Sequence, residues 1–225
     1  MHIPDGIVPA QVCVAGYGLT GLLTWYSLRQ INRRGNPNAQ IPKASLLTAA
    51  FFVASSIYIP IPPTSVHLLL NGLLGVVLGY FAPLAILVGL FFQALIVGHG
   101  GLTTLGINAT LLGVPALLAH HIFQLRFFGL FQPPGRLSSS GPPSTTATGL
   151  FAFLGGACGI ALAAFIFMGI VISTVPADFG AGAEQRAIMT LTFMHLPLAL
   201  LEGSFTAMLA IFLQRVKPEL LIERK

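Results

Sequence analysis

Residues 149–175 read GLFAFLGGACGIALAAFIFMGIVISTV, a stretch without a single charged side chain. It is longer than the roughly 20 apolar residues that an α-helix needs to cross the hydrocarbon core of a bilayer. Hydrophobic residues follow one another here, whereas the strands of a membrane β-barrel alternate apolar and polar residues. Because a backbone in lipid must satisfy its own hydrogen bonds, this stretch predicts a transmembrane helix.

The composition extends this prediction to the whole chain of 225 residues. It is 55% hydrophobic and 8% charged, with a mean hydropathy of +0.85, well outside the range of soluble globular domains. Six further apolar stretches are expected to cross the membrane: residues 7–28, 44–60, 65–82, 83–98, 102–125 and 187–214. The predicted fold is therefore all-α, a polytopic membrane protein whose single transmembrane domain, residues 1–225, is a compact bundle of about seven transmembrane helices.

The positions of the basic residues predict how this bundle is oriented. With the N-terminus outside, every Lys and Arg except Arg186 falls on the cytoplasmic side, as the positive-inside rule requires. The C-terminus is then cytoplasmic. The net charge of +5 does not indicate nucleic-acid binding, because the basic residues lie between apolar stretches and not on one soluble face. Residues 126–148, rich in Pro, Gly, Ser and Thr, are expected to form a flexible cytoplasmic linker.

The opening residues MHIPDG place His2 next to the amine of Met1. That amine, the amide nitrogen of His2 and the His2 ring nitrogen nearer the backbone can close two chelate rings in one plane. A fourth nitrogen would complete a square, which suits Ni(II), Cu(II) or low-spin Co(II), whereas zinc prefers a tetrahedron. The amine and the amide must both lose a proton, so the affinity is expected to rise with pH.

His67, in PPTSVHLLLNG, is expected at the outer start of the 65–82 span and could supply the fourth nitrogen. Asn71 would lie one helical turn away on the same face, where it could orient the His67 ring or form an interhelical hydrogen bond. Asp5 is expected to cap the first helix. Three polar residues near the outer ends of the next two spans could support the metal site or satisfy loop backbone: Gln93, His99 and Asn108.

His195 and Glu202 are weaker site candidates in the last span, seven residues apart and therefore near one helical face. Structural pairing is the expected role of both. They also define an alternative of another class, a polytopic membrane enzyme that uses them as base or ligand. The sequence contains no HExxH or comparable compact catalytic motif to favour that alternative. A third alternative, a purely structural assembly subunit, predicts no tight metal binding.

Four stretches together resemble the substrate-binding subunit of energy-coupling-factor transporters for cobalt and nickel: MHIPDG (1–6), SVHLLLNGLLG (65–75), QALIVGHGGLTTLGIN (93–108) and MHLPLALLEG (194–203). The resemblance implies a bundle of seven helices with the N-terminus tucked inside. It also implies that four nitrogens hold the ion, the Met1 amine, the His2 amide, the His2 ring and the His67 ring. This set agrees with the chelate inferred from the opening residues.

The resemblance implies partners as well: a transmembrane coupling subunit, cytoplasmic ATPase subunits and a small accessory membrane subunit. The chain has no GxxxxGK[ST] phosphate loop, so we expect a partner to hydrolyse ATP and this chain not to be an enzyme. No catalytic cofactor is expected, since Co²⁺ or Ni²⁺ is the transported ligand.

The expected function is high-affinity capture of Co²⁺ or Ni²⁺ from the periplasm or exterior. The ion would then cross the bacterial inner or plasma membrane through an ATP-driven importer and feed cobalamin biosynthesis. A nickel-specific version of the same transporter is the alternative, because the nitrogen count does not separate the two ions and the Irving–Williams order favours Ni(II). The preference for cobalt rests on the resemblance alone.

Overall fold

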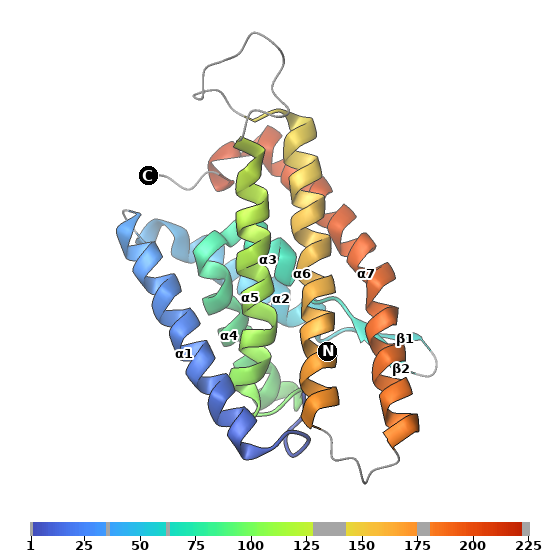
Figure 1. The fold of residues 1–225 in the computed structure, drawn as a ribbon. Coiled ribbons are helices and arrows are strands. Elements are labelled where there is room, and N and C mark those ends of the chain that lie inside the picture. The colour runs from blue at the N-terminus through green and yellow to red at the C-terminus, as the bar shows by residue number, and fades with distance from the viewer. Residues whose placement is uncertain (1, 35–36, 62–63, 128–142, 175–180, 222–225) are drawn as a thin grey trace.

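The computed structural model describes residues 2–34, 37–61, 64–127, 143–174 and 181–221, and within them the chain forms a helical bundle (Figure 1). The helices are α1 (Ala10–Arg33), α2 (Ile41–Ser55), α3 (Asn71–Leu78), α4 (Ala82–Phe92), α5 (Leu105–Gln124), α6 (Thr145–Thr174) and α7 (Ala181–Val216). The predicted helical class is confirmed. The prediction lacked one element, an antiparallel hairpin of β1 (Tyr58–Ile61) and β2 (Thr64–His67) between α2 and α3.

Four stretches of the described residues are long and apolar enough to cross a membrane: Asn71–Val97, Leu105–Phe127, Thr145–Thr174 and Ile188–Val216. The last three agree with predicted spans to within a few residues. In α6 the helix already begins at Thr145, so the end of the predicted linker 126–148 is helical. The middle of that linker, residues 128–142, lies outside the described part of the chain.

The stretch Asn71–Val97 contains a reversal of direction, at Gly79. This glycine has φ +59°, a left-handed value that favours glycine, and it separates α3 from α4. On α3, Gly75 lies against Ala116, while beyond the reversal Pro83 lies against Gly113, an earlier residue of α5. After Gly79, the chain therefore contacts an earlier part of α5 than it does before Gly79.

The predicted span 65–82 is wrong in its first part, because His67 ends strand β2 and α3 has only 8 residues. The sequence YIPIPPTSVH explains the difference. Its prolines remove backbone donors and its β-branched residues favour extended backbone, so a helix is disfavoured there. Leu70, at φ +49°, then turns the chain from the hairpin into α3.

Small residues let the central helices approach closely. A Cβ added to Gly75 would lie 2.0 Å from the carbonyl oxygen of Ala116 in α5. One added to Gly159 of α6 would lie 2.7 Å from the Cα of Gly72 in α3. The backbones themselves therefore form the contacts between α3 and its neighbours α5 and α6.

The C-terminal ends of α1, α5 and α7 lie together at one end of the bundle (Figure 1). These ends carry Arg33, Arg126 and Arg215 in or just after the last helical turn. At the same end, the Lys43 Nζ of α2 donates to the carbonyl oxygens of Val77 and Leu220, at 3.0 Å each. These described basic residues, which the sequence assigned to one side of the membrane, thus gather at one end of the bundle.

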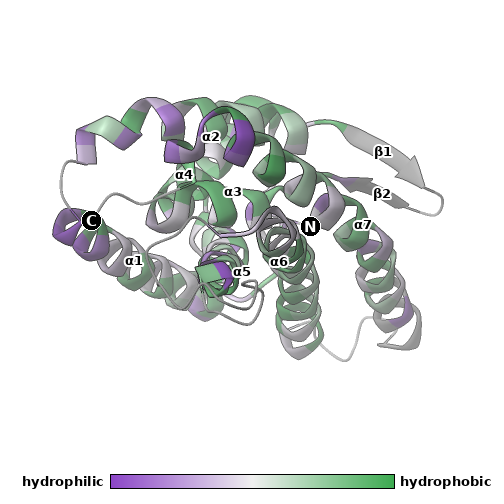
Figure 2. Ribbon diagram, turned by 90° about the horizontal axis from the view of Figure 1, so that it is seen from above, coloured by the Kyte–Doolittle hydropathy of each residue, from purple (hydrophilic) through white to green (hydrophobic). Residues whose placement is uncertain are grey.

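The outer surfaces of the long helices are strongly apolar. Val14 on α1 and Met208 on α7 are 72% and 70% exposed. Seen along the bundle (Figure 2), hydrophobic residues cover much of α4, α6 and α7, while hydrophilic residues gather at one end of α1 and along part of α2. An exposed apolar surface of this extent is expected to face lipid, and the chain is a multi-pass membrane protein.

Candidate metal centre

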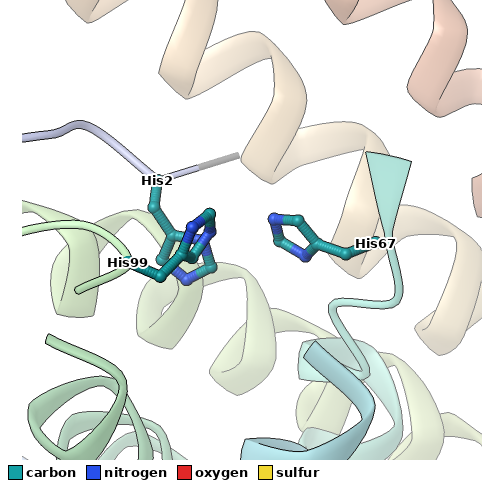
Figure 3. Close-up of side chains that lie close together, drawn as sticks. All are labelled: His2, His67 and His99. Atoms are coloured by element: carbon teal, nitrogen blue, oxygen red, sulfur yellow. The ribbon is translucent and has the colours of Figure 1, made fainter. Parts of the chain in front are cut away.

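Three histidines from distant parts of the sequence meet inside the bundle: His2 in the N-terminal segment, His67 at the end of β2 and His99 in the loop between α4 and α5. One ring nitrogen from each lies within 4.8 Å of the others. The rings of His2 and His99 lie side by side, and the ring of His67 points toward them from the opposite side (Figure 3). His2 and His67 are buried and His99 is half-buried.

Within this cluster, His99 Nε2 and His2 Nδ1 lie 2.8 Å apart. They share a hydrogen bond, so one ring donates and the other accepts. The same separation suits metal binding, because two nitrogens about 2.0 Å from one ion and at right angles to each other lie about 2.8 Å apart. His99, which the sequence suggested only as a supporting residue, is therefore as well placed for an ion as the two predicted ligands.

Burial keeps these rings in the form that binds metals. It lowers the pKa of His2 well below its ordinary value and lowers that of His99 to about 4. Both imidazoles are then neutral near pH 7, and a neutral imidazole offers a lone pair to a metal ion.

The N-terminal segment is held in the bundle by the residue that follows His2. Ile3 is fully buried, and its backbone N–H donates to Asn108 Oδ1 at 2.9 Å. Its carbonyl oxygen accepts from Asn108 Nδ2 at 3.0 Å and from the Thr104 hydroxyl at 2.7 Å. Asn108, predicted as a supporting residue, thus acts on the backbone next to His2.

Asp5 fastens the same segment to the start of α5. Its Oδ1 accepts hydrogen bonds from the backbone N–H groups of Thr103 and Thr104, at 3.0 and 3.2 Å, and from both hydroxyls. These hydrogen bonds lower the pKa of the Asp5 carboxyl, and the bond from the Thr103 hydroxyl contributes most. The predicted cap on the first helix is wrong: no side chain caps α1, and Asp5 serves the N-terminal end of α5, where a negative charge is favourable.

The loop that carries His99 needs its glycines. Gly98 and Gly100 have φ of +68° and +80°. A Cβ added to Gly101 would lie 1.9 Å from Asp5 Oδ1, so the carboxylate occupies the space that a side chain would fill. The sequence GHGG therefore places His99 beside His2 and leaves room for the anchor of the N-terminal segment.

Glu202 of α7 contacts the chain just after His67. Its two carboxylate oxygens accept from the backbone N–H groups of Leu69 and Leu70, at 2.6 and 2.7 Å. His195 Nδ1 donates to the Leu191 carbonyl oxygen at 2.7 Å, and His195 Nε2 has no hydrogen-bond partner among the described residues. The hydrogen bonds of both side chains thus run to backbone groups. Because both Glu202 oxygens are used by backbone donors, Glu202 is poorly suited to be the base of an enzyme.

Two of the predicted supporting residues act elsewhere. The Asn71 amide donates to the carbonyl oxygens of Gly159 and Leu112, at 2.9 and 3.4 Å, and so forms the interhelical hydrogen bonds of the alternative interpretation. It does not share a helical face with His67, because His67 belongs to strand β2 and a turn separates it from α3. Gln93 donates to the Ser55 hydroxyl and joins the end of α4 to α2. Met1 lies outside the described residues.

Residues 2–220 match the CbiM family, described as the cobalt uptake substrate-specific transmembrane region. A cobalt transport protein CbiM of Sorangium cellulosum is 28% identical over 98% of this chain and 94% of its own length. A fused nickel transport protein NikMN of Rhodobacter capsulatus is 30% identical over 100% of this chain and 65% of its own length.

A crystal structure of a transition metal transporter shares the fold. It superposes with a TM-score of 0.71 over 96% of this chain and 93% of that one, at 22% sequence identity. Helices and loops that carry the histidine cluster thus belong to an architecture already seen in another protein.

Proposed function

The chain belongs to the CbiM family of cobalt uptake transmembrane proteins, and from this premise we propose that it captures Co(II) or Ni(II) at the outer side of the membrane. Relatives named for cobalt and for nickel transport support uptake of a metal ion over an enzymatic activity. The observation that carries the proposal is the cluster of His2, His67 and His99, whose nitrogens lie within 4.8 Å of one another.

The proposed ligands are the Met1 amine, the His2 amide, the His2 ring and the His67 ring. The way in which Asn108 and Asp5 hold the N-terminal segment supports this set, because it brings the residue next to Met1 into the bundle. His99 is the nearest further nitrogen donor and a candidate ligand through Nε2. A set made of nitrogen atoms favours Ni(II) and Co(II) over harder ions such as Mg(II).

We further propose seven passages through the membrane with the N-terminal side outside. The basic ends of α1, α5 and α7 would then face the cytoplasm, and the Asp5 anchor would face the exterior. An ion arriving from the periplasm would meet the loop of His99 and the segment of His2 before it met the reversal at Gly79, between α3 and α4.

Passage to the cytoplasm requires the ligands to separate, and we propose that partner subunits drive this step. The partners would be a transmembrane coupling subunit, cytoplasmic ATPases and an accessory membrane subunit. The nickel relative named as a fused protein is longer than this chain, which supports assembly with further components. Cobalt is the preferred ion, with cobalamin biosynthesis as its destination, because the family description names cobalt.

The proposal is tested by titrating the full-length protein in lipid nanodiscs with Co(II), Ni(II) and Zn(II). Calorimetry measures the affinity, and visible absorption reports the ligand field of Co(II) and Ni(II). We expect tight binding of Co(II) or Ni(II) with the spectrum of a square-planar nitrogen field, and much weaker binding of Zn(II). Absence of binding by all three ions, or tightest binding of Zn(II) together with a tetrahedral Co(II) spectrum, would overturn it.

A further inference from the structure

The carboxylate of Glu202 accepts hydrogen bonds from the backbone of the turn between His67 and α3. It is buried, with 1% of its surface exposed, and it comes from the middle of α7, 133 residues from Leu69 in sequence. A carboxyl group is costly to bury unless its oxygens accept hydrogen bonds. Here the two backbone N–H groups are the donors.

The turn that Glu202 holds is conformationally demanding. Leu70 has φ +49°, the left-handed region that a residue with a branched side chain rarely adopts. It is the one residue other than glycine with a positive φ in the described part of the chain. Such a conformation persists when surrounding contacts enforce it. The hydrogen bond from the Leu70 N–H to Glu202 at 2.7 Å is a contact of this kind.

The position of His67 depends on this turn. His67 lies two residues before Leu69, at the end of a hairpin only four residue pairs long. A two-stranded hairpin is marginally stable by itself, so it does not fix the direction of its last side chain. The segment after His67 is held to α7 by Glu202, while Ile3, the neighbour of His2, is held by Asn108 of α5 and the His2 ring bonds to His99.

We propose that Glu202 is a positioning residue for His67: by binding the Leu69 and Leu70 N–H groups, it fixes the turn that aims the His67 ring at His2 and His99. Glutamate suits this role because both of its oxygens are acceptors facing two donors. A glutamine would present its NH₂ group to one of these N–H groups, and an alanine would present nothing. The readout by metal affinity rests on the proposed function, but the geometric effect on His67 does not.

The test is a double-mutant cycle in full-length protein, with Glu202→Gln, His67→Ala and the double variant titrated with CoCl₂. Removal of a residue that orients a metal ligand lowers affinity by about 10- to 100-fold. We expect Glu202→Gln to cause a loss in this range in the wild-type background and a loss of about twofold or less in the His67→Ala background, since the effect passes through His67. Equal losses in both backgrounds, or none in either, would overturn the proposal.

A second measurement is independent of metal binding. Site-resolved labelling of His67 by diethylpyrocarbonate, followed by mass spectrometry, reports how firmly the ring is held. We expect Glu202→Gln to speed labelling of His67 by about 10-fold or more, on the scale of the affinity effect. The matched control is Thr192→Val, which removes a buried hydroxyl on the same helix. Within the described part of the chain, this hydroxyl bonds only to the Ile188 carbonyl oxygen, so its loss should leave both measurements unchanged.

The two measurements distinguish a failure of the proposed metal capture from a failure of the proposed positioning role of Glu202. If wild-type protein binds no Co(II) but Glu202→Gln still speeds the labelling of His67, metal capture is wrong and the positioning role stands. If wild-type protein binds Co(II) and Glu202→Gln changes neither its affinity nor the labelling rate, metal capture stands and the positioning role is wrong. Size-exclusion elution matching wild type shows that the variants are folded.

Discussion

The side-chain amide of Asn108 pairs with both polar groups of the Ile3 backbone, accepting from its N–H at 2.9 Å and donating to its carbonyl oxygen at 3.0 Å. The two residues are 105 positions apart in sequence. Together with the fully buried Ile3 side chain, this pair docks the N-terminal segment on α5 and so determines where His2 lies. The candidate metal centre is therefore built on an extended segment that helix α5 holds in place.

We expect Asn108→Ala to lower Co(II) affinity by about 10-fold. It leaves the buried Ile3 N–H without its acceptor, and an unsatisfied buried donor costs about 1–3 kcal/mol. Calorimetric titration in nanodiscs measures this loss. Thr48→Val is the control, because its hydroxyl bonds only within α2, to the Ala44 carbonyl oxygen. An unchanged affinity in Asn108→Ala would show that Ile3 is held mainly by its side chain.

A short histidine-free extension before Met1 should abolish tight binding. It converts the Met1 amine into an amide and removes one proposed ligand, so the loss should reach at least about 100-fold, the upper end of what changes around metal ligands cost. The same extension placed after the C-terminus is the matched control. Equal binding by both extended proteins would indicate a site made of His2, His67 and His99 alone.

The affinity for Co(II) should rise by about tenfold or more between pH 6.5 and 7.5. The ion competes with protons for the terminal amine, whose reference pKa is about 7.7–8.0, and for the His2 amide. The buried rings of His2 and His99 have lowered pKa values and have already lost their protons in this range. A pH-independent affinity between these values would therefore point to imidazole ligands only.

Asp5→Asn should loosen the N-terminal segment and lower Co(II) affinity by roughly threefold, because the charge at the start of α5 contributes about 0.3–1 kcal/mol. The lowered pKa of Asp5 fixes the direction of a pH effect. The stabilisation is complete above the unfolded pKa, near 3.8, and is lost as the pH falls through the lower folded pKa. Thermal unfolding of wild type and variant between pH 3 and 6 should converge at the acid end, and curves that diverge there would contradict this assignment.

Gly75→Ala should destabilise the bundle strongly, since its Cβ would lie 2.0 Å from the Ala116 carbonyl oxygen. The helices α3 and α5 would have to separate, and overpacking of this kind costs about 1–3 kcal/mol or more. Gly18→Ala is the matched control: no atom lies within 4 Å of its added Cβ, so alanine should raise stability slightly through its higher helix propensity. The unfolding temperatures of the Gly75→Ala and Gly18→Ala variants are compared in one detergent. Equal temperatures would show that α3 can move without a loss of stability.

Much of the candidate site could be predicted from local sequence. His2 beside a terminal amine is a chelating pattern visible in the first two residues. The sequence GHGG places His99 in a glycine-rich loop. The errors concern Asp5 and Asn71. A helix-capping rule looks only at neighbours in sequence, whereas Asp5 bonds to Thr103, 98 residues away. The helical face assigned to Asn71 assumed an unbroken helix, and the hairpin before Leu70 removes that assumption.

By itself, the sequence determined that the chain crosses the membrane as helices, because long apolar stretches leave no other way to satisfy the backbone in lipid. It also determined that His2 and His67 are metal-ligand candidates. Only the tertiary structure decided that His99 lies against His2, 97 residues away, and that Glu202 meets the backbone behind His67. The physical reason is that these contacts depend on how closely glycine-containing helices pack and where the chain reverses, and neither follows from the residues nearby in sequence.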